Sequence, residues 1–195
     1  MLGTQYGLSE FIGNVFNILY TRFFFSGSRL IRRPFYLRGR EHFDWGNNLT
    51  IGRSCRFDLD GDGITLRFGD NCKLNDRVHI VAHQLVDIGS DVLMASNIFI
   101  SDSSHGSYTG TSPDAPDIAP DKRPIISNSV KIGDRVWIGE NVSVLPGVTV
   151  GKGSILGSNS VISHDVPDNC IVAGVPAKVI KRWDSSSKTW IRNTK

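Results

Sequence analysis

The chain has 195 residues, of which 39% are hydrophobic and 21% are charged, and its formal net charge is +3. This length and composition predict one soluble globular domain. The small net charge, without a basic stripe carrying aromatic residues for base stacking, argues against a nucleic-acid-binding function.

The first predicted element is an N-terminal segment, residues 1–44, in which apolar residues at roughly helical spacing run from Phe11 to Phe24. Arginines follow closely: Arg22, Arg29, Arg32, Arg33, Arg38 and Arg40. We expect an amphipathic helix that caps the open end of the domain. The alternative is peripheral membrane contact through an apolar face flanked by arginines. Polar residues interrupt the apolar stretch, so neither a signal peptide nor a membrane span is indicated.

The next element is a repeat with a period of six residues. An aliphatic residue stands at every sixth position in one uninterrupted series: Ile126, Ile132, Ile138, Val144, Val150, Leu156 and Ile162. Such a period fits neither an α-helix nor a simple strand, and it predicts a parallel β-helix built from hexapeptides. With some interruptions of the six-residue spacing, the pattern extends over residues 45–182. Glycine follows many of the aliphatic residues, where we expect corners with positive φ.

The register of the repeat slips in three places, at residues 57–68, 80–88 and 100–126. Insertions in a solenoid become loops that collect on one side of the stack, where function usually lies. The third slip is the longest and carries four prolines. We therefore predict a protruding loop over residues 106–124 and expect the functional site at its base.

Cys55 and Cys72 fall on small, inward-pointing positions of their repeats, and Cys170 stands alone. An odd number of cysteines placed in this way predicts reduced, buried thiols and a cytosolic protein.

The base of the long loop carries Ser101-Asp102-Ser103-Ser104-His105-Gly106. His105 leaves the last regular coil and is expected to be partly exposed, so its imidazole would accept a proton near neutral pH. Asp102 is the candidate for orienting that ring. The alternative is a surface histidine that only caps a turn.

Two patterns suggest a metal site, but neither is complete enough to predict one. Residues 58–63 begin like an EF-hand loop, but Gly69 stands where the bidentate glutamate is needed. His79, His83 and His105 suggest the zinc triad of β-helical carbonic anhydrases, but the spacing within one coil is wrong.

Three motifs together carry a family resemblance: the Ser101–Gly106 turn before a loop, the stretch Ile132–Val142 (IGDRVWIGENV), and Ala173–Ile180 (AGVPAKVI). Over residues 45–182 the chain resembles the hexapeptide-repeat acetyltransferases, most closely the bacterial O-acetyltransferases of lipopolysaccharide and exopolysaccharide biosynthesis. The resemblance implies an all-β, left-handed parallel β-helix with three hexapeptides per turn. It also implies a homotrimer that binds acetyl-coenzyme A between neighbouring β-helices.

The resemblance further implies roles for particular residues. His105 matches the general base, and Trp137 matches a tryptophan beside the reaction centre. The other cofactor positions are Glu140, Ser158, Ser163 and His164 along the pantetheine arm or nucleotide, and Lys178 and Lys181 near its phosphates. Glu140 and His164 differ in type from the residues common there, which leaves backbone contacts as their expected contribution. Asn75 and His83 match acceptor positions, with a left-handed corner for Asn75 and a loop cap for His83 as the alternatives.

The implied function is acetyl-CoA-dependent O-acetylation of a sugar hydroxyl on a bacterial surface polysaccharide or its precursor, without a covalent acyl-enzyme. The alternatives are N-acetylation of a nucleotide-linked amino sugar and a non-catalytic β-helix scaffold. The expected location is the cytoplasm, at the inner face of the membrane if residues 1–44 contact it. Residues 183–195 form a C-terminal tail that either packs near the nucleotide or frays.

Overall fold

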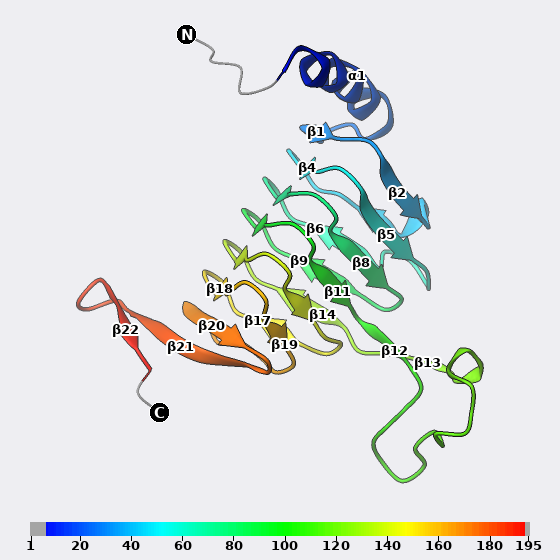
Figure 1. The fold of residues 1–195 in the computed structure, drawn as a ribbon, viewed down its shortest axis with the longest axis vertical. Coiled ribbons are helices and arrows are strands. Elements are labelled where there is room, and N and C mark those ends of the chain that lie inside the picture. The colour runs from blue at the N-terminus through cyan, green and yellow to red at the C-terminus, as the bar shows by residue number, and fades with distance from the viewer. Residues whose placement is uncertain (1–6, 194–195) are drawn as a thin grey trace.

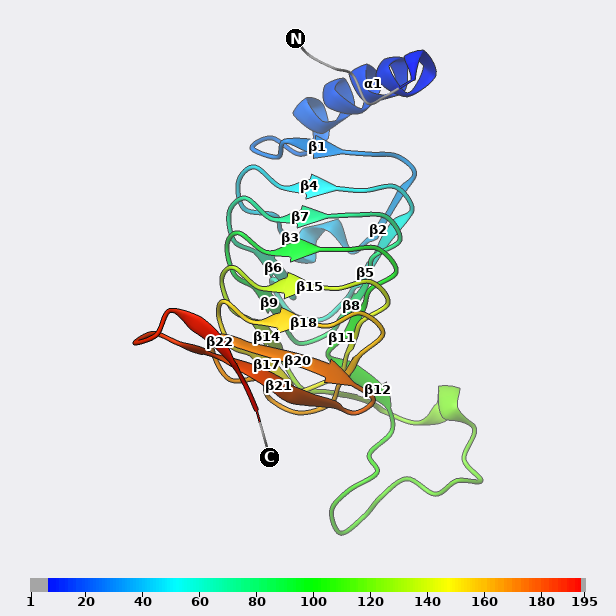
Figure 2. The same ribbon diagram turned by 60° about the vertical axis from the view of Figure 1, so that its left-hand side comes forward.

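In a computed structural model that describes residues 7–193, the chain forms a left-handed parallel β-helix with one α-helix, α1 (Leu8–Phe24), across its N-terminal end (Figure 1). Figure 2 shows the coils stacked one above the next, with the loop projecting from the side of the stack. The sequence-based fold class is confirmed, including the N-terminal helix and the protruding loop.

Three sheets form the walls of the stack. Wall A contains β1 (Leu30–Ile31), β4 (Thr50–Ile51), β7 (Lys73–Leu74), β10 (Leu93–Met94), β15 (Trp137–Ile138), β18 (Ile155–Leu156) and β20 (Cys170–Gly174). Wall B contains β2 (Phe35–Arg38), β5 (Cys55–Leu59), β8 (His79–Ala82), β11 (Phe99–Ser101), β16 (Ser143–Val144) and β19 (Val161–Ile162). Wall C contains β3 (Phe43–Asp44), β6 (Leu66–Phe68), β9 (Val86–Ile88), β14 (Val130–Ile132) and β17 (Thr149–Val150).

The remaining elements lie outside these walls. An antiparallel pair, β12 (Ser103–His105) and β13 (Ile125–Ser127), forms the base of the long loop. β21 (Ala177–Asp184) and β22 (Thr189–Arg192) extend wall A antiparallel to β20. Two short 3₁₀ helices are η1 (Arg40–His42) and η2 (Pro120–Lys122).

The sixfold aliphatic residues from Ile132 to Ile162 fill the interior of the coils, whereas Ile126 is half-buried in β13 at the base of the long loop and does not belong to the stack. Ile138, Val144, Val150 and Leu156 are each no more than 1% exposed. In successive coils they stand directly above one another, as Ile138 does over Leu156 in wall A. Full burial of such a side chain contributes about 1.5–3 kcal/mol, so the repeat itself supplies the main stabilisation of the stack.

The glycine that follows an inward aliphatic residue is required by space and not by a positive φ, which corrects the sequence-based expectation. A Cβ on Gly52 would lie 2.4 Å from the backbone carbon of Asn75 in the next coil, although the φ of Gly52 is not positive. Positive φ occurs instead at Ser54, Arg77 and Asn97, three places after the inward residues of their strands. The two roles therefore belong to different positions of each hexapeptide.

All of the insertions lie at one corner of the stack, between wall B and wall C, which confirms the sequence-based expectation. Residues 39–42, 60–65, 83–85 and 102–129 each connect a wall B strand to the next wall C strand. This B–C corner therefore carries a column of loops that ends in the longest one.

The ends of the stack are closed by different elements. Residues 30–44 already form a coil, because β1, β2 and β3 pair with β4, β5 and β6; the stack therefore starts before Trp45. At the other end, the tail pairs as β22, and the rings of Trp183 and Trp190 lie 5.5 Å apart at their centroids. Among residues 7–193, no helix is both long enough and apolar enough to cross a membrane.

The three cysteines are free and buried, as expected from their positions in the repeat. Burial raises the pKa of Cys55 and of Cys72 to about 11, and burial also raises the pKa of Cys170. The thiols therefore stay protonated and unreactive near neutral pH.

Candidate active site

His105 stands at the end of β12, where the chain leaves wall B for the long loop. β12 pairs with β13, and His105 lies opposite Ile125 in this short hairpin. The side chain is exposed, and in residues 7–193 neither ring nitrogen has a hydrogen-bond partner. An exposed imidazole on a hydrogen-bonded hairpin is free to accept a proton from a bound hydroxyl.

The loop that follows His105 is held by Arg123 and Tyr108. The Arg123 guanidinium donates to the Tyr108 hydroxyl (3.0 Å) and to the carbonyl oxygens of Ile118 (2.7 Å) and Pro116 (3.3 Å). The Tyr108 hydroxyl in turn donates to the backbone carbonyl of His105. Sequence reasoning missed both residues; a lone arginine within a proline-rich loop was the available signal.

Gly106 is needed for this arrangement. Its φ is +100°, and a Cβ there would lie 3.0 Å from Cδ of Arg123 and 3.1 Å from a carboxylate oxygen of Asp114. That same carboxylate oxygen accepts a hydrogen bond from the backbone N–H of Ser107 (2.7 Å). The turn after His105 is therefore packed tightly against the middle of the loop at Asp114 and against its far end at Arg123.

Asp102 does not orient the His105 ring, which corrects the sequence-based hypothesis. Asp102 is fully buried, and its carboxylate accepts hydrogen bonds from the backbone N–H groups of His83 (3.0 Å), Gln84 (2.7 Å) and Leu85 (2.8 Å). Three charge-assisted bonds saturate this carboxylate. Asp102 instead ties the loop of the preceding coil to the coil that carries His105.

Three other predicted residues share the B–C corner with His105. His83 is half-buried in the loop at 83–85, one coil before His105. Ser163 and His164 follow β19, and the Ser163 hydroxyl lies 2.9 Å from Nδ1 of His164. The structure thus places histidines from three coils along one edge of the stack.

The other cofactor candidates lie on wall A or at the corner between walls A and B. Trp137 is 50% exposed on the outer face of wall A, between Leu93 and Ile155 of the neighbouring strands. Glu140 and Ser158 follow β15 and β18 at the A–B corner. Lys178 and Lys181 are exposed on β21.

Glu140 differs in type from the residues that the resemblance leads us to expect at this position, and the structure explains the difference. Its carboxylate accepts hydrogen bonds from the backbone N–H of Ser96 (3.0 Å) and from the side-chain amide of Asn97 (2.8 Å) in the preceding coil. The side chain is therefore used to join two coils, and only the backbone of Glu140 remains for a ligand.

Asn75 lies at the A–B corner and not beside His105, contrary to the expected acceptor-side position. It follows β7 and is exposed, while the loop of the same coil at the B–C corner is 83–85. Its φ is not positive, so Asn75 is not a left-handed corner either; that conformation belongs to Arg77.

The outer faces of the walls differ sharply in chemistry. The outward ladder of wall C alternates in charge: Asp44, Arg67, Asp87, Lys131 and then Thr149. The corresponding ladder of wall A carries Leu93, Trp137, Ile155 and Ile171 in consecutive coils. An exposed apolar strip of this kind is typical of a contact surface, whereas wall C suits solvent.

The first metal hypothesis places Asp58 in a calcium loop, but the structure places it within strand β5. Its carboxylate contacts the guanidinium groups of Arg38 (3.2 Å) and Arg56 (2.6 Å) and Nε2 of His79 (3.0 Å). Burial of the Asp58 carboxyl opposes ionisation, but the hydrogen bonds from Arg56 and His79 prevail and lower its pKa. Asp58 and His79 are therefore hydrogen-bonded to each other on wall B.

The six-residue repeat, its glycine spacing and the loop after β12 together define a hexapeptide-repeat protein. Residues 129–164 match the family model described as bacterial transferase hexapeptide (six repeats). The chain is 45% identical over 190 residues to the lipopolysaccharide biosynthesis O-acetyl transferase WbbJ of Escherichia coli (strain K12), whose activity is itself assigned provisionally. The match covers 97% of this chain and 96% of WbbJ. The chain therefore belongs to the hexapeptide-repeat acetyltransferases.

Two solved structures illustrate the fold. The hexapeptide-repeat acetyltransferase VCA0836 of Vibrio cholerae O1 biovar eltor, complexed with acetyl-coenzyme A, is 29% identical, with a TM-score of 0.54 over 70% of this chain and 72% of that chain. AntD, an N-acyltransferase from Bacillus cereus in complex with dTDP and 3-hydroxybutyryl-CoA, is 20% identical, with a TM-score of 0.64 over 93% of this chain and 91% of that chain. At that identity, AntD supports the fold alone.

Proposed function

We propose that this protein is an acetyl-CoA-dependent O-acetyltransferase that modifies a sugar hydroxyl of a bacterial surface polysaccharide or of its precursor. The observation that carries the proposal is the exposed imidazole of His105, on a hairpin at the corner where the loops gather and without a partner among the described residues. Nearly full-length similarity to WbbJ supports the reaction class, and similarity to the VCA0836 complex supports acetyl-coenzyme A as the donor.

In the proposed reaction, His105 acts as general base. The imidazole accepts the proton of the sugar hydroxyl while the hydroxyl oxygen attacks the acetyl carbonyl carbon. The carbon–sulfur bond then breaks, and the coenzyme A thiolate leaves with the proton from the imidazolium. The products are an acetyl ester and coenzyme A, and no covalent acyl-enzyme is needed. A positioned general base contributes about 10²–10⁴-fold to such a rate.

The proposed active unit is a homotrimer. Within one chain, His105 lies at the B–C corner, whereas Trp137 lies on wall A and Ser158 at the A–B corner, so the two groups of residues face different sides. A neighbouring copy that presents its wall A to this chain's B–C corner would bring them together and cover the apolar strip around Trp137.

In such an assembly, the donor would lie in the cleft between two copies. Trp137, Ser158 and the backbone of Glu140 would contact the pantetheine arm, Ser163 and His164 would line the opposite side, and Lys178 and Lys181 would meet the phosphates. The exposed positions of both lysines on β21 support this last role. His83, one coil from His105, is the proposed acceptor contact.

We place the enzyme in the cytoplasm, peripheral to the inner face of the membrane. Three free, buried cysteines support a reducing compartment. The exposed apolar residues of α1 support contact with a membrane surface.

The experiment that tests the proposal is a coenzyme A release assay with acetyl-CoA and a panel of monosaccharides, nucleotide-linked sugars and lipid-linked sugars. We expect release with a hydroxyl acceptor and a product that hydroxylamine cleaves, since it cleaves an ester and not an amide. A hydroxylamine-resistant product would show N-acetylation instead. Absence of release above the no-acceptor control across all three classes would contradict the proposal.

A further inference from the structure

Helix α1 is oriented with its polar face inward and its apolar face outward, the reverse of an ordinary surface helix. Asn17 and Thr21, on the face toward the stack, are 5% and 0% exposed. Phe16, Leu19 and Phe23, on the opposite side, are 58%, 58% and 82% exposed. Exposed apolar side chains on this outer face are Phe11, Ile12, Val15, Phe16, Ile18, Leu19 and Phe23.

Buried hydrogen bonds fix this orientation. The Thr21 hydroxyl donates to the carbonyl of Asn17 (2.6 Å) and accepts from the backbone N–H of Ile31 (2.8 Å). The side-chain oxygen of Asn17 accepts from the backbone N–H of Arg33 (3.3 Å) and from its Nε (3.4 Å). Rolling the helix to bury its apolar face would break these bonds and leave buried polar groups unpaired, at a cost of about 1–3 kcal/mol each. The apolar face is therefore held away from the protein core.

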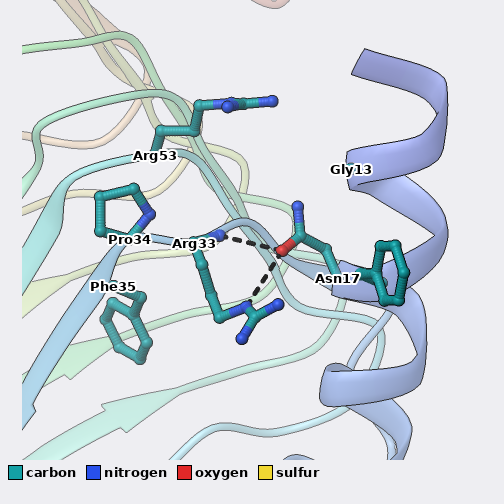
Figure 3. A pocket seen from close by; sticks show the side chains of 7 residues that line it. Gly13, Asn17, Arg33, Pro34, Phe35 and Arg53 are labelled. Atoms are coloured by element: carbon teal, nitrogen blue, oxygen red, sulfur yellow. Dashed lines mark hydrogen bonds between the residues drawn. The ribbon is translucent and has the colours of Figure 1, made fainter. Parts of the chain in front are cut away.

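A cavity of about 540 Å³ opens where the edge of α1 meets the first coils (Figure 3). It is lined by Gly13, Phe16, Asn17, Arg33, Pro34, Phe35 and Arg53. Arg33 and Arg53 supply two guanidinium groups, and Phe16 and Phe35 supply apolar rings. An acidic group, Glu10, lies 4.0 Å from Arg53. Two guanidinium groups that line one cavity beside an apolar surface suit a phosphate group that is attached to something apolar.

Positive charge also borders the rest of the apolar face. Arg22 lies in the last turn of α1, and Arg29 and Arg40 lie just beyond its end; all three are exposed. Arg40 donates to the carbonyl of Phe24 and lies over the ring of Phe25. An apolar helix face with arginines along its borders has the charge pattern that binds an anionic lipid surface. Two copies meeting through this face would bring their arginines together, which like-charge repulsion disfavours.

We propose that α1 lies on the surface of an anionic lipid bilayer, with its apolar face among the acyl chains and a lipid phosphate in the Arg33–Arg53 cavity. This extends the peripheral location proposed above to a defined surface and ligand class. Lipid binding and acetyl transfer use different parts of the stack, since α1 lies across its N-terminal end and His105 follows β11 in the middle of wall B, so the two are separately measurable.

The test is sedimentation of the full-length protein with vesicles. Phosphatidylglycerol–phosphatidylcholine vesicles are compared with pure phosphatidylcholine vesicles for the wild type and four variants. Leu19→Ser with Phe23→Ser removes apolar area from exposed positions, Arg53→Gln removes a charge from the cavity, and Arg33→Lys keeps the charge but loses the planar fork. Arg192→Gln removes an exposed arginine at the opposite end of the stack and is the matched control.

We expect wild-type binding to the anionic vesicles that weakens with salt, a tenfold or greater loss in the Leu19/Phe23 variant, and about a fivefold loss in Arg53→Gln. Arg33→Lys should lose less than Arg53→Gln, and Arg192→Gln should bind like the wild type. Acetyl transfer to a soluble acceptor should be equal in all four variants, which separates this proposal from the proposed function.

Three results would overturn the proposal. The first is wild-type binding to anionic vesicles no stronger than to phosphatidylcholine. The second is a change in oligomeric state of the Leu19/Phe23 variant by light scattering, which would assign the apolar face to a second copy. The third is thermal stabilisation by inorganic phosphate that is lost in Arg53→Gln, without any vesicle binding, which would assign the cavity to a soluble phosphate ligand.

Discussion

Replacement of His105 by alanine tests the proposed chemistry most directly. The ring is exposed and has no hydrogen-bond partner within the described residues, so its removal should change the free energy of unfolding by less than about 0.5 kcal/mol. Loss of a general base should lower kcat by about 10²–10⁴-fold, which corresponds to about 3–5 kcal/mol in the activation barrier. KM should change little, because the proton transfer occurs in the transition state.

The assay is coenzyme A release detected with a thiol reagent, with Tm measured on the same samples. The protein's own cysteines do not interfere, because burial raises the pKa of Cys55 and Cys72 to about 11. Thr111→Ala is the control, since Thr111 is exposed in the same loop. Equal release by the wild type and His105→Ala with the true acceptor would refute the assignment of the base. A large drop in Tm with the loss of activity would show instead that His105 has a structural role.

Two further variants test the surroundings of the site, and a third tests the Asp58 ion-pair cluster on wall B. Asp102→Ala should lower the free energy of unfolding by about 3–5 kcal/mol in a urea titration, because three buried backbone N–H groups lose their acceptor. Arg123→Ala should speed proteolysis within residues 106–124 and lower kcat while Tm changes little, since Arg123 holds an exposed loop. Asp58→Asn should make the free energy of unfolding depend less on pH in the acid range. The Asp58 pKa is lowered in the fold, so its carboxylate stabilises the wild type at neutral pH, and this contribution is lost as the pH falls through the acid range.

Each of these variants has an outcome that would contradict the reasoning. Unchanged stability of Asp102→Ala would mean that water or another group replaces the carboxylate. Equal proteolysis of the loop with and without Arg123 would mean that Tyr108 and Asp114 suffice to hold it. Parallel pH–stability curves for Asp58→Asn and the wild type would mean that Arg56 and His79 do not stabilise the carboxylate.

The sequence predicts the stack of coils well because the repeat depends only on the spacing of residues that are close together along the chain. Each aliphatic residue six places after the last fixes one wall, and each slip in that spacing fixes one loop. Even so, the reason for the glycines was misjudged. Gly52 looks like a corner in the sequence, whereas its absent side chain makes room for the backbone of Asn75, which is visible only once two coils are stacked.

Contacts between coils were beyond the reach of the sequence. Asp102 stands three residues before His105, which suggested an interaction within the motif. Its true partners are N–H groups at residues 83–85, brought near by the coil geometry. The orientation of α1 could not be predicted from the sequence for the same reason. Helical spacing identifies an apolar face but not whether that face points to the stack or to solvent. Here the hydrogen bonds of Asn17 and Thr21 to the first coil determine the orientation.

The position of His105 relative to α1 leads to a prediction about the acceptor. α1 lies across one end of the stack, and wall B runs from β2 through β5 and β8 to β11, immediately before His105 (Figure 1). Three strand spacings amount to about 14 Å, so with α1 on a bilayer His105 would stand at least that far from the lipid. A sugar bonded directly to a lipid phosphate would then lie too close to the membrane. We therefore expect acetylation of a lipid-linked oligosaccharide at a sugar distal to the lipid, with little transfer to the lipid-linked monosaccharide. Mass spectrometry of fragmented products locates the acetyl group, and its presence on the lipid-proximal sugar would contradict this orientation of the stack.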